Sequence, residues 1–184
     1  MSLLPAFSGQ WSYDDRHNCQ EIVSRVWLGP HTAAKLSNLH QEIGVTDIVY
    51  VRSSSSGPER DLLRPRSSVH RSFEVDIRDD GVSSCQKIFS LFVDSLSRIL
   101  LESETNVVLV LGLTGMNRSA SLLAAFLIRA HGMDATQASQ YLMTRRRCVA
   151  ISVTLRRQLV EFEISPPKNP VPSIRSAKRS LLDL

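Results

Sequence analysis

The residues best suited to chemistry lie in Val107–Ser121, which reads VVLVLGLTGMNRSAS. A valine-rich apolar run leads into a turn with two glycines, and an arginine and a serine then open an apolar, helix-like segment. N–H groups of such a turn, and of the helix N-terminus that follows it, direct partial positive charge into one small bowl. Arg118 can bind two phosphate oxygens with its planar guanidinium, and Gly115 can take the positive φ angle of a tight turn. The stretch therefore predicts a phosphate-binding loop made of Gly112, Leu113, Thr114, Gly115, Met116, Asn117, Arg118 and Ser119.

The spacing within this loop resembles that of cysteine-dependent protein phosphatases, whose loop reads H-C-x5-R-S/T. Gly112 stands at the cysteine position, six residues before Arg118, and Leu111 stands at the histidine position. A cysteine there attacks phosphorus because the loop lowers the pKa of its thiol, and glycine has no atom that could replace it. We therefore expect no catalytic residue at this position and no thiol-based phosphatase activity.

The wider chain resembles the dual-specificity phosphatases and, within them, the serine/threonine/tyrosine-interacting pseudophosphatases, in which glycine also replaces the cysteine. Those relatives retain the histidine that is Leu111 here. The resemblance covers roughly Trp11 to Glu163. It implies an α/β fold of the phosphatase type, with three layers and a central, mostly parallel sheet flanked by helices. The residues that carry it outside the loop are Gln20-Glu21-Ile22, Leu28-Gly29-Pro30, Val51-Arg52, Val75-Asp76-Ile77 with Asp79, and Tyr141 through Arg147 followed by Cys148.

The resemblance also implies roles for three residues. Asp79 lies where a general acid would protonate the leaving oxygen, although its neighbour Asp80 leaves this assignment open by one residue. Arg118 would bind phosphate, and Ser119 would steady the thiolate as a leaving group. Without a nucleophile, Asp79 is vestigial and only Arg118 keeps its purpose. The implied function is an inactive pseudophosphatase that binds phosphotyrosine or phosphothreonine proteins and shields or anchors them, with MAP kinases as the first class of partner to consider.

Two other functions stay open at this point. The chain could be an adaptor that binds partners through a surface that recognises no phosphate. It could also be a phosphatase with Thr114 or Ser119 as the nucleophile, but a hydroxyl needs a neighbouring base, and no histidine is near these residues in sequence. An ordinary strand-to-helix turn would explain the glycines and Arg118 alone, but not the wider resemblance.

The elements needed to position the loop can be predicted from hydrophobic patterning. Apolar runs predict a first strand at Ile22–Leu28 and two central strands at Thr46–Arg52 and Asn106–Leu111. Helical spacing predicts helices at Gln86–Leu101, Ser119–Ala130 and Thr154–Glu163. Gly132 fits the position after a helix end, and Asp134 with Gln137 fits a capping box.

The composition, with 42% apolar and 22% charged residues in 184, suits a single globular domain. We expect a domain over residues 20–164, an N-terminal extension over 1–19 and a proline-rich, basic, disordered tail over 165–184. Ser53–Ser68 is serine-rich and is expected to form a surface loop.

Three cysteines without a CxxC pair, and five histidines without metal-binding spacing, predict no metal site and no cofactor. The histidines are expected on the surface or in loops. The net charge of +4 fits an anionic partner. We expect a soluble monomer in the cytoplasm, with nuclear entry left open, that binds phosphoproteins rather than nucleic acid or membranes.

Two arginine-containing patterns have ordinary explanations. Arg145–Arg147 lies at the end of a helix, where positive charge favours the helix dipole, although contact with a phosphoprotein is an alternative. Cys19 and Arg25 have the bare C-x5-R spacing, but no glycine lies between them, so a second phosphate loop is not expected there.

Overall fold

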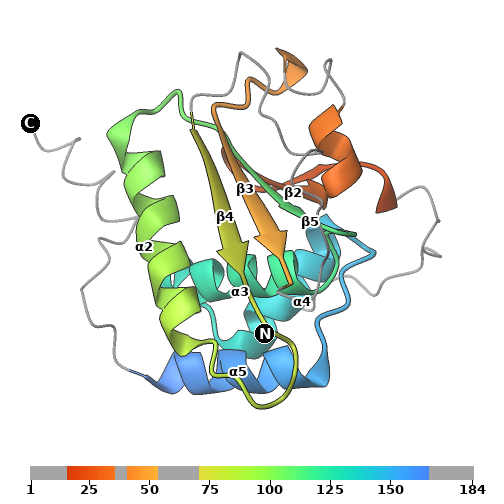
Figure 1. The fold of residues 1–184 in the computed structure, drawn as a ribbon. Coiled ribbons are helices and arrows are strands. Elements are labelled where there is room, and N and C mark those ends of the chain that lie inside the picture. The colour runs from red at the N-terminus through yellow and green to blue at the C-terminus, as the bar shows by residue number, and fades with distance from the viewer. Residues whose placement is uncertain (1–15, 36–40, 54–70, 166–184) are drawn as a thin grey trace, which may run out of the picture.

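The computed structural model describes residues 16–35, 41–53 and 71–165 (Figure 1). Most of the expected N-terminal extension, the serine-rich loop and the proline-rich tail lie outside these residues. Within the described part of the chain, no helix is both long and apolar enough to cross a lipid bilayer.

A five-stranded sheet forms the centre of the fold, with the strand order β1-β2-β5-β3-β4. Strands β2, β5, β3 and β4 run parallel, and β1 pairs with β2 in the antiparallel direction. The prediction of an α/β fold with a central, mostly parallel sheet is confirmed. The strands span Gln20–Val23 (β1), Val26–Pro30 (β2), Asp47–Arg52 (β3), Arg71–Asp76 (β4) and Val108–Gly112 (β5).

The prediction of one strand over Ile22–Leu28 is wrong, because the chain turns back within that range. Arg25 takes a φ of 69°, and its N–H donates to Glu21 Oε1 at 3.0 Å, which closes a tight turn between β1 and β2. The Arg25 guanidinium donates to the carbonyl oxygens of Leu100 at 3.2 Å and Ser103 at 2.8 Å. This arginine therefore satisfies the end of a helix and takes no part in a phosphate loop.

Four α-helices pack against one another on one side of the sheet (Figure 1). All three predicted helices are confirmed, and α3 is a core helix, with eleven of its fourteen residues buried. Gly132 ends α3 in the left-handed conformation, and Asp134 with Gln137 forms the expected capping box. The helices span Gln86–Glu102 (α2), Arg118–His131 (α3), Ala135–Arg145 (α4) and Val153–Ile164 (α5).

The two faces of the central strands contribute to separate apolar clusters, because successive side chains of a strand point to opposite faces. Val49, Val51, Val108 and Val110 pack toward the helices. Their alternates form a smaller cluster with Ala33 of the short 3-10 helix η2 (His31–Lys35), and these are Ile48, Tyr50, Leu109 and Leu111. Side chains therefore fix the central strands from both faces.

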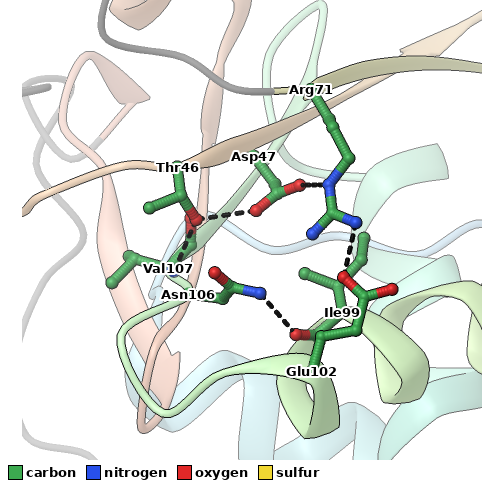
Figure 2. A network of polar contacts seen from close by, with 7 residues as sticks. All are labelled: Thr46, Asp47, Arg71, Ile99, Glu102, Asn106 and Val107. Atoms are coloured by element: carbon green, nitrogen blue, oxygen red, sulfur yellow. Dashed lines mark hydrogen bonds and ion pairs between the residues drawn. The ribbon is translucent and has the colours of Figure 1, made fainter.

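A polar network closes the edge of the sheet at which the parallel strands begin (Figure 2). The buried carboxylate of Asp47 accepts from Thr46 Oγ1 and from Arg71 Nε, both at 2.6 Å. Arg71 Nη1 also contacts Glu102 Oε2 at 2.5 Å, which links β3 and β4 to the end of α2. Asn106 Nδ2 donates to the carbonyl of Ile99 at 2.8 Å. These polar groups hold the strand starts and α2 together.

Candidate functional site

A pocket of about 100 Å³ lies at the opposite edge, where the parallel strands end. All eight residues of the predicted loop, Gly112–Ser119, line it, and they follow β5 directly. His31 follows β2, while Val51 and Arg52 end β3, so the rest of the wall comes from the two neighbouring strands. Ligands of open α/β sheets bind at this edge.

These three wall residues were not predicted as site residues, and His31 is a half-buried residue at the start of the short 3-10 helix η2. The strand order β2-β5-β3 is the information that places them beside the loop, and it is not visible in one sequence.

Gly115 lets the loop curl back against strand β2. Its φ is +67°, in the left-handed region that side chains disfavour. A Cβ atom there would also lie 2.6 Å from the carbonyl carbon and oxygen of Gly29. Glycine is therefore needed at position 115 both for its backbone conformation and for the close approach of β2.

A buried arginine holds the loop from behind. Arg146 is only 1% exposed, and its guanidinium donates to the carbonyl oxygens of Gly115 and Thr114, each at 3.0 Å. It also donates to the carbonyl of Asn18 at 2.6 Å and to Gln20 Oε1. Neither interpretation of the arginine run describes Arg146, which joins the loop to the segment before β1. Three successive arginines give no sequence signal for which one points inward.

The loop carbonyls point away from the pocket. Those of Thr114 and Gly115 bind the buried guanidinium, and that of Met116 accepts from Ala150 N at 2.9 Å. None of these donors lines the pocket. In a trans peptide the next N–H points opposite to the carbonyl, so the N–H groups of residues 115, 116 and 117 face the pocket side. The first N–H groups of α3, which have no partner within the helix, add to this set of donors.

Two arginines bring positive charge to the pocket wall, and they differ in how they are paired. Arg52 Nη1 contacts Glu74 Oε2 at 2.7 Å. Arg118 begins α3, and its Nε is buried without a hydrogen-bond partner among the described residues. Arg118 therefore leaves a cation beside the set of N–H donors, which is the arrangement that suits a phosphate group.

Asp79 is tied to the loop and does not line the pocket. Its Oδ2 accepts from Asn117 Nδ2 at 2.8 Å, and its Oδ1 accepts from Ser152 Oγ at 2.9 Å. Asn117 Oδ1 in turn accepts from Ser152 N at 2.9 Å. Both carboxylate oxygens are thus engaged in joining the loop to the start of α5. In this arrangement Asp79 anchors the loop.

Asp80 has a different environment from its neighbour. Its carboxylate accepts from Ser83 N and Ser83 Oγ at 2.7 Å and from Val82 N at 2.9 Å. These bonds, those from Ser83 first, lower the pKa of Asp80 to about 2. Asp80 is therefore ionised at neutral pH and bound within its own turn, so Asp79 is the carboxylate connected to the loop.

The cysteines lie outside the pocket lining. Burial raises the pKa of Cys19 to about 12, so its thiol is protonated at neutral pH. Cys85 and Cys148 are buried, and all three cysteines are free. No group of three or more histidine, cysteine, aspartate or glutamate side chains among the described residues could hold a metal ion.

Sequence comparison finds similarity to one protein family and to several known proteins. The family profile described as "Dual specificity phosphatase, catalytic domain" matches residues 26–165. The chain is 29% identical over 157 residues to the human serine/threonine/tyrosine-interacting protein, covering 84% of this chain and 68% of that protein. It is 27% identical over 154 residues to dual specificity protein phosphatase 1 of Arabidopsis thaliana, covering 84% of this chain and 73% of that protein.

A solved structure shows the same similarity in three dimensions. The crystal structure of the human tyrosine phosphatase-like serine/threonine/tyrosine-interacting protein superposes with a TM-score of 0.71 at 28% identity. The match covers 80% of this chain and 97% of that one. The similarity therefore spans nearly the whole of that solved chain.

Proposed function

Because the chain belongs to the dual specificity phosphatase family, we propose that it is a catalytically inactive member that binds phosphorylated proteins in its Gly112–Ser119 loop. One observation supports the proposal: in the pocket lined by the loop, Arg118 Nε is buried without a partner among the described residues, beside the N–H groups of the loop. By the family spacing, Gly112 stands where the nucleophile would be. This combination can hold a phosphate group but supplies no thiol to attack it.

Binding is favoured by charge-assisted hydrogen bonds in a confined pocket. The guanidinium of Arg118 matches two phosphate oxygens, and each hydrogen bond to a charged group contributes roughly 1.5–3 kcal/mol. The loop N–H groups can donate to the remaining phosphate oxygens without rearrangement, because Arg146 and Ala150 already bind the loop carbonyls on the other side. A preformed site of this kind loses little conformational entropy when it binds.

The partners would be signalling proteins that carry phosphotyrosine or phosphothreonine, with MAP kinases the first class to test. Binding without hydrolysis would shield the phosphate group from active phosphatases or anchor the phosphorylated partner protein. We expect the protein to meet these partners in the cytoplasm and, where the partners enter it, in the nucleus. The name of the human relative, serine/threonine/tyrosine-interacting protein, supports this proposal.

The decisive experiment compares peptides of one sequence that carry phosphotyrosine, phosphothreonine or neither. Isothermal titration calorimetry should show binding only with phosphate present. Arg118→Ala should weaken that binding about 30- to 100-fold, equivalent to roughly 2–3 kcal/mol. Arg98→Ala, an exposed arginine on α2, is the matched control and should bind as the wild type does. Equal affinity for phosphorylated and unphosphorylated peptides would favour the adaptor function and overturn the proposal.

A separate assay addresses a replacement nucleophile. Among the described residues, Ser119 Oγ makes no hydrogen bond to a base, and Thr114 is exposed to solvent, so no described group activates either hydroxyl. Purified protein should therefore leave an aryl phosphate unhydrolysed. Turnover that disappears in Arg118→Ala would show instead that the pocket is an active site.

A further inference from the structure

Gly112 lies directly against Ser119 in the lining of the pocket. A Cβ atom at position 112 would stand 2.5 Å from Ser119 Oγ and 3.1 Å from Ser119 Cβ. Real Cβ atoms essentially never make contacts below 3.0 Å. The Ser119 hydroxyl therefore occupies space that a side chain at position 112 would need.

The Ser119 hydroxyl has no acceptor in the part of the chain that the structure describes. Ser119 is 1% exposed, and its Oγ has no hydrogen-bond partner among the described residues. Two neighbouring hydroxyls are satisfied, since Ser121 Oγ donates to the carbonyl of Arg118 at 2.7 Å and Ser152 Oγ donates to Asp79 at 2.9 Å. A buried polar group without a partner is unfavourable, so one that lines a pocket points to a missing ligand atom.

The start of α3 adds further unsatisfied donors beside this hydroxyl. Asn117 is the N-cap residue of α3, but its side chain makes no capping hydrogen bond and is used to bind Asp79. Ser119 is the second residue of the helix, so its own N–H has no partner within the helix. The hydroxyl and N–H of one residue are therefore both available to an anion in the pocket.

We propose that Ser119 has taken over the position left empty at Gly112 and donates a hydrogen bond to the innermost oxygen of a bound phosphate group. This inference rests on the proposed function. It assigns Ser119 a binding role that differs from steadying a thiolate, the role implied by the family resemblance. The ligand class is a phosphate dianion, either free or as a monoester.

A hydroxyl in place of a thiolate changes the charge at the innermost part of the pocket, beside Gly112. A thiolate at position 112 would place a negative charge against the phosphate, whereas the Ser119 hydroxyl is a neutral donor. Like charges in a poorly solvated site repel, and a hydrogen bond to a charged acceptor is favourable. The altered floor therefore suits retention of the phosphate.

The test measures dissociation constants by NMR titration with inorganic phosphate and, in a second arm, with phenyl phosphate. Ser119→Ala should weaken both about 5- to 10-fold, because both ligands offer the same innermost oxygen. Ser121→Ala is the matched control, since Ser121 is equally buried but already bonded within α3, and its affinity should match the wild type. Without phosphate, Ser119→Ala should melt no lower than the wild type, because it removes an unsatisfied hydroxyl.

A double-variant comparison separates a binding role from a packing effect. Gly112→Ala should also weaken phosphate binding, because the added Cβ displaces the hydroxyl. Adding Ser119→Ala to it should then cause no further loss. Wild-type affinity in Ser119→Ala, or independent losses in the double variant, overturns the role of Ser119 while leaving the proposed function intact. A wild-type protein that binds neither ligand overturns the proposed function and this inference with it.

Discussion

The two edges of the central sheet both place an arginine beside the ends of parallel strands, but they use it in opposite ways. At the edge where the strands begin, Arg71 contacts the carboxylates of Asp47 at 2.6 Å and Glu102 at 2.5 Å (Figure 2). Where the strands end, Arg118 lines the pocket, and its Nε is buried without a partner among the residues that the structure describes. An arginine satisfied by its own chain stabilises the fold, whereas a buried guanidinium nitrogen without a partner marks a candidate site for an anion.

The difference extends to the groups around each arginine. The hydrogen bonds that Arg71 donates to Asp47, followed by those to Glu102, raise the pKa of Arg71, so this cation is matched by negative charges of the chain itself. Around Arg118 the loop supplies donors instead of acceptors. The positive charge and the donors of such a pocket are compensated only when an anion binds there.

The largest effect is expected at Arg146, which holds the loop from behind and so contributes both to stability and to phosphate binding. Arg146→Met should lower the free energy of unfolding by about 3–4 kcal/mol, because buried carbonyl oxygens lose their donors. It should also abolish phosphopeptide binding, since the loop loses its hold. Urea unfolding and calorimetry measure both, with exposed Arg147→Met as the control. Retention of stability and binding would show that Arg146 is dispensable to the loop.

Arg71→Ala should affect stability alone. The free energy of unfolding should fall by about 2 kcal/mol, because buried Asp47 loses its cation, an effect moderated by the 37% exposure of the Arg71 side chain. Combining it with Asp47→Asn should recover part of the loss. The affinity of the folded protein for phosphopeptide should not change, and a change would mean that the two edges are coupled.

Arg118→Lys should affect binding alone and by less than removal of the side chain. Lysine keeps the charge but loses the planar pair of donors, so phosphopeptide affinity should fall about 5- to 10-fold. The melting temperature should match that of the wild type. A lysine variant as weak as Arg118→Ala would indicate that geometry, and not charge, supplies nearly all of the affinity.

The smallest effect concerns Asp80, which should titrate with a pKa of about 2, below its ordinary value of 3.8. Because the folded-state pKa is depressed, its contribution to stability is complete at neutral pH and is lost as the pH falls from about 4 toward 2. NMR of the side-chain carboxyl measures the titration. Ser83→Ala should move the midpoint upward, and an unmoved midpoint would show that these hydrogen bonds do not form in solution.

Local patterns predicted the elements that carry strong signals of their own. The apolar run before Gly112 and the spacing to Arg118 predicted a strand, a loop and a helix, and the structure contains β5 and α3 there. The capping box of Asp134 could also be predicted from the sequence, because its two residues lie three positions apart. Such features depend on neighbours in sequence, so no knowledge of the fold was needed.

Features that depend on distant contacts were missed. Strand β4 lies at the sheet edge, and Phe73, one of its apolar residues, is 38% exposed, so it lacks a clear apolar pattern. The turn at Arg25 uses a positive φ that arginine rarely adopts, supported by contacts with the end of α2. Arg146 points inward because it donates hydrogen bonds to carbonyl oxygens of Asn18 and Thr114, which lie far from it in sequence.

The contact between Gly112 and Ser119 also determines how a side chain at position 112 could be accommodated. A cysteine introduced there would require Ser119 Oγ to rotate away and Ser119 Cβ to shift slightly, since the new Cβ would lie 2.5 and 3.1 Å from them. Ser119 belongs to a helix that is almost wholly buried, so its backbone cannot shift freely. A side chain at position 112 would therefore be accommodated mainly by rotation of the Ser119 hydroxyl, and only slightly by movement of the helix.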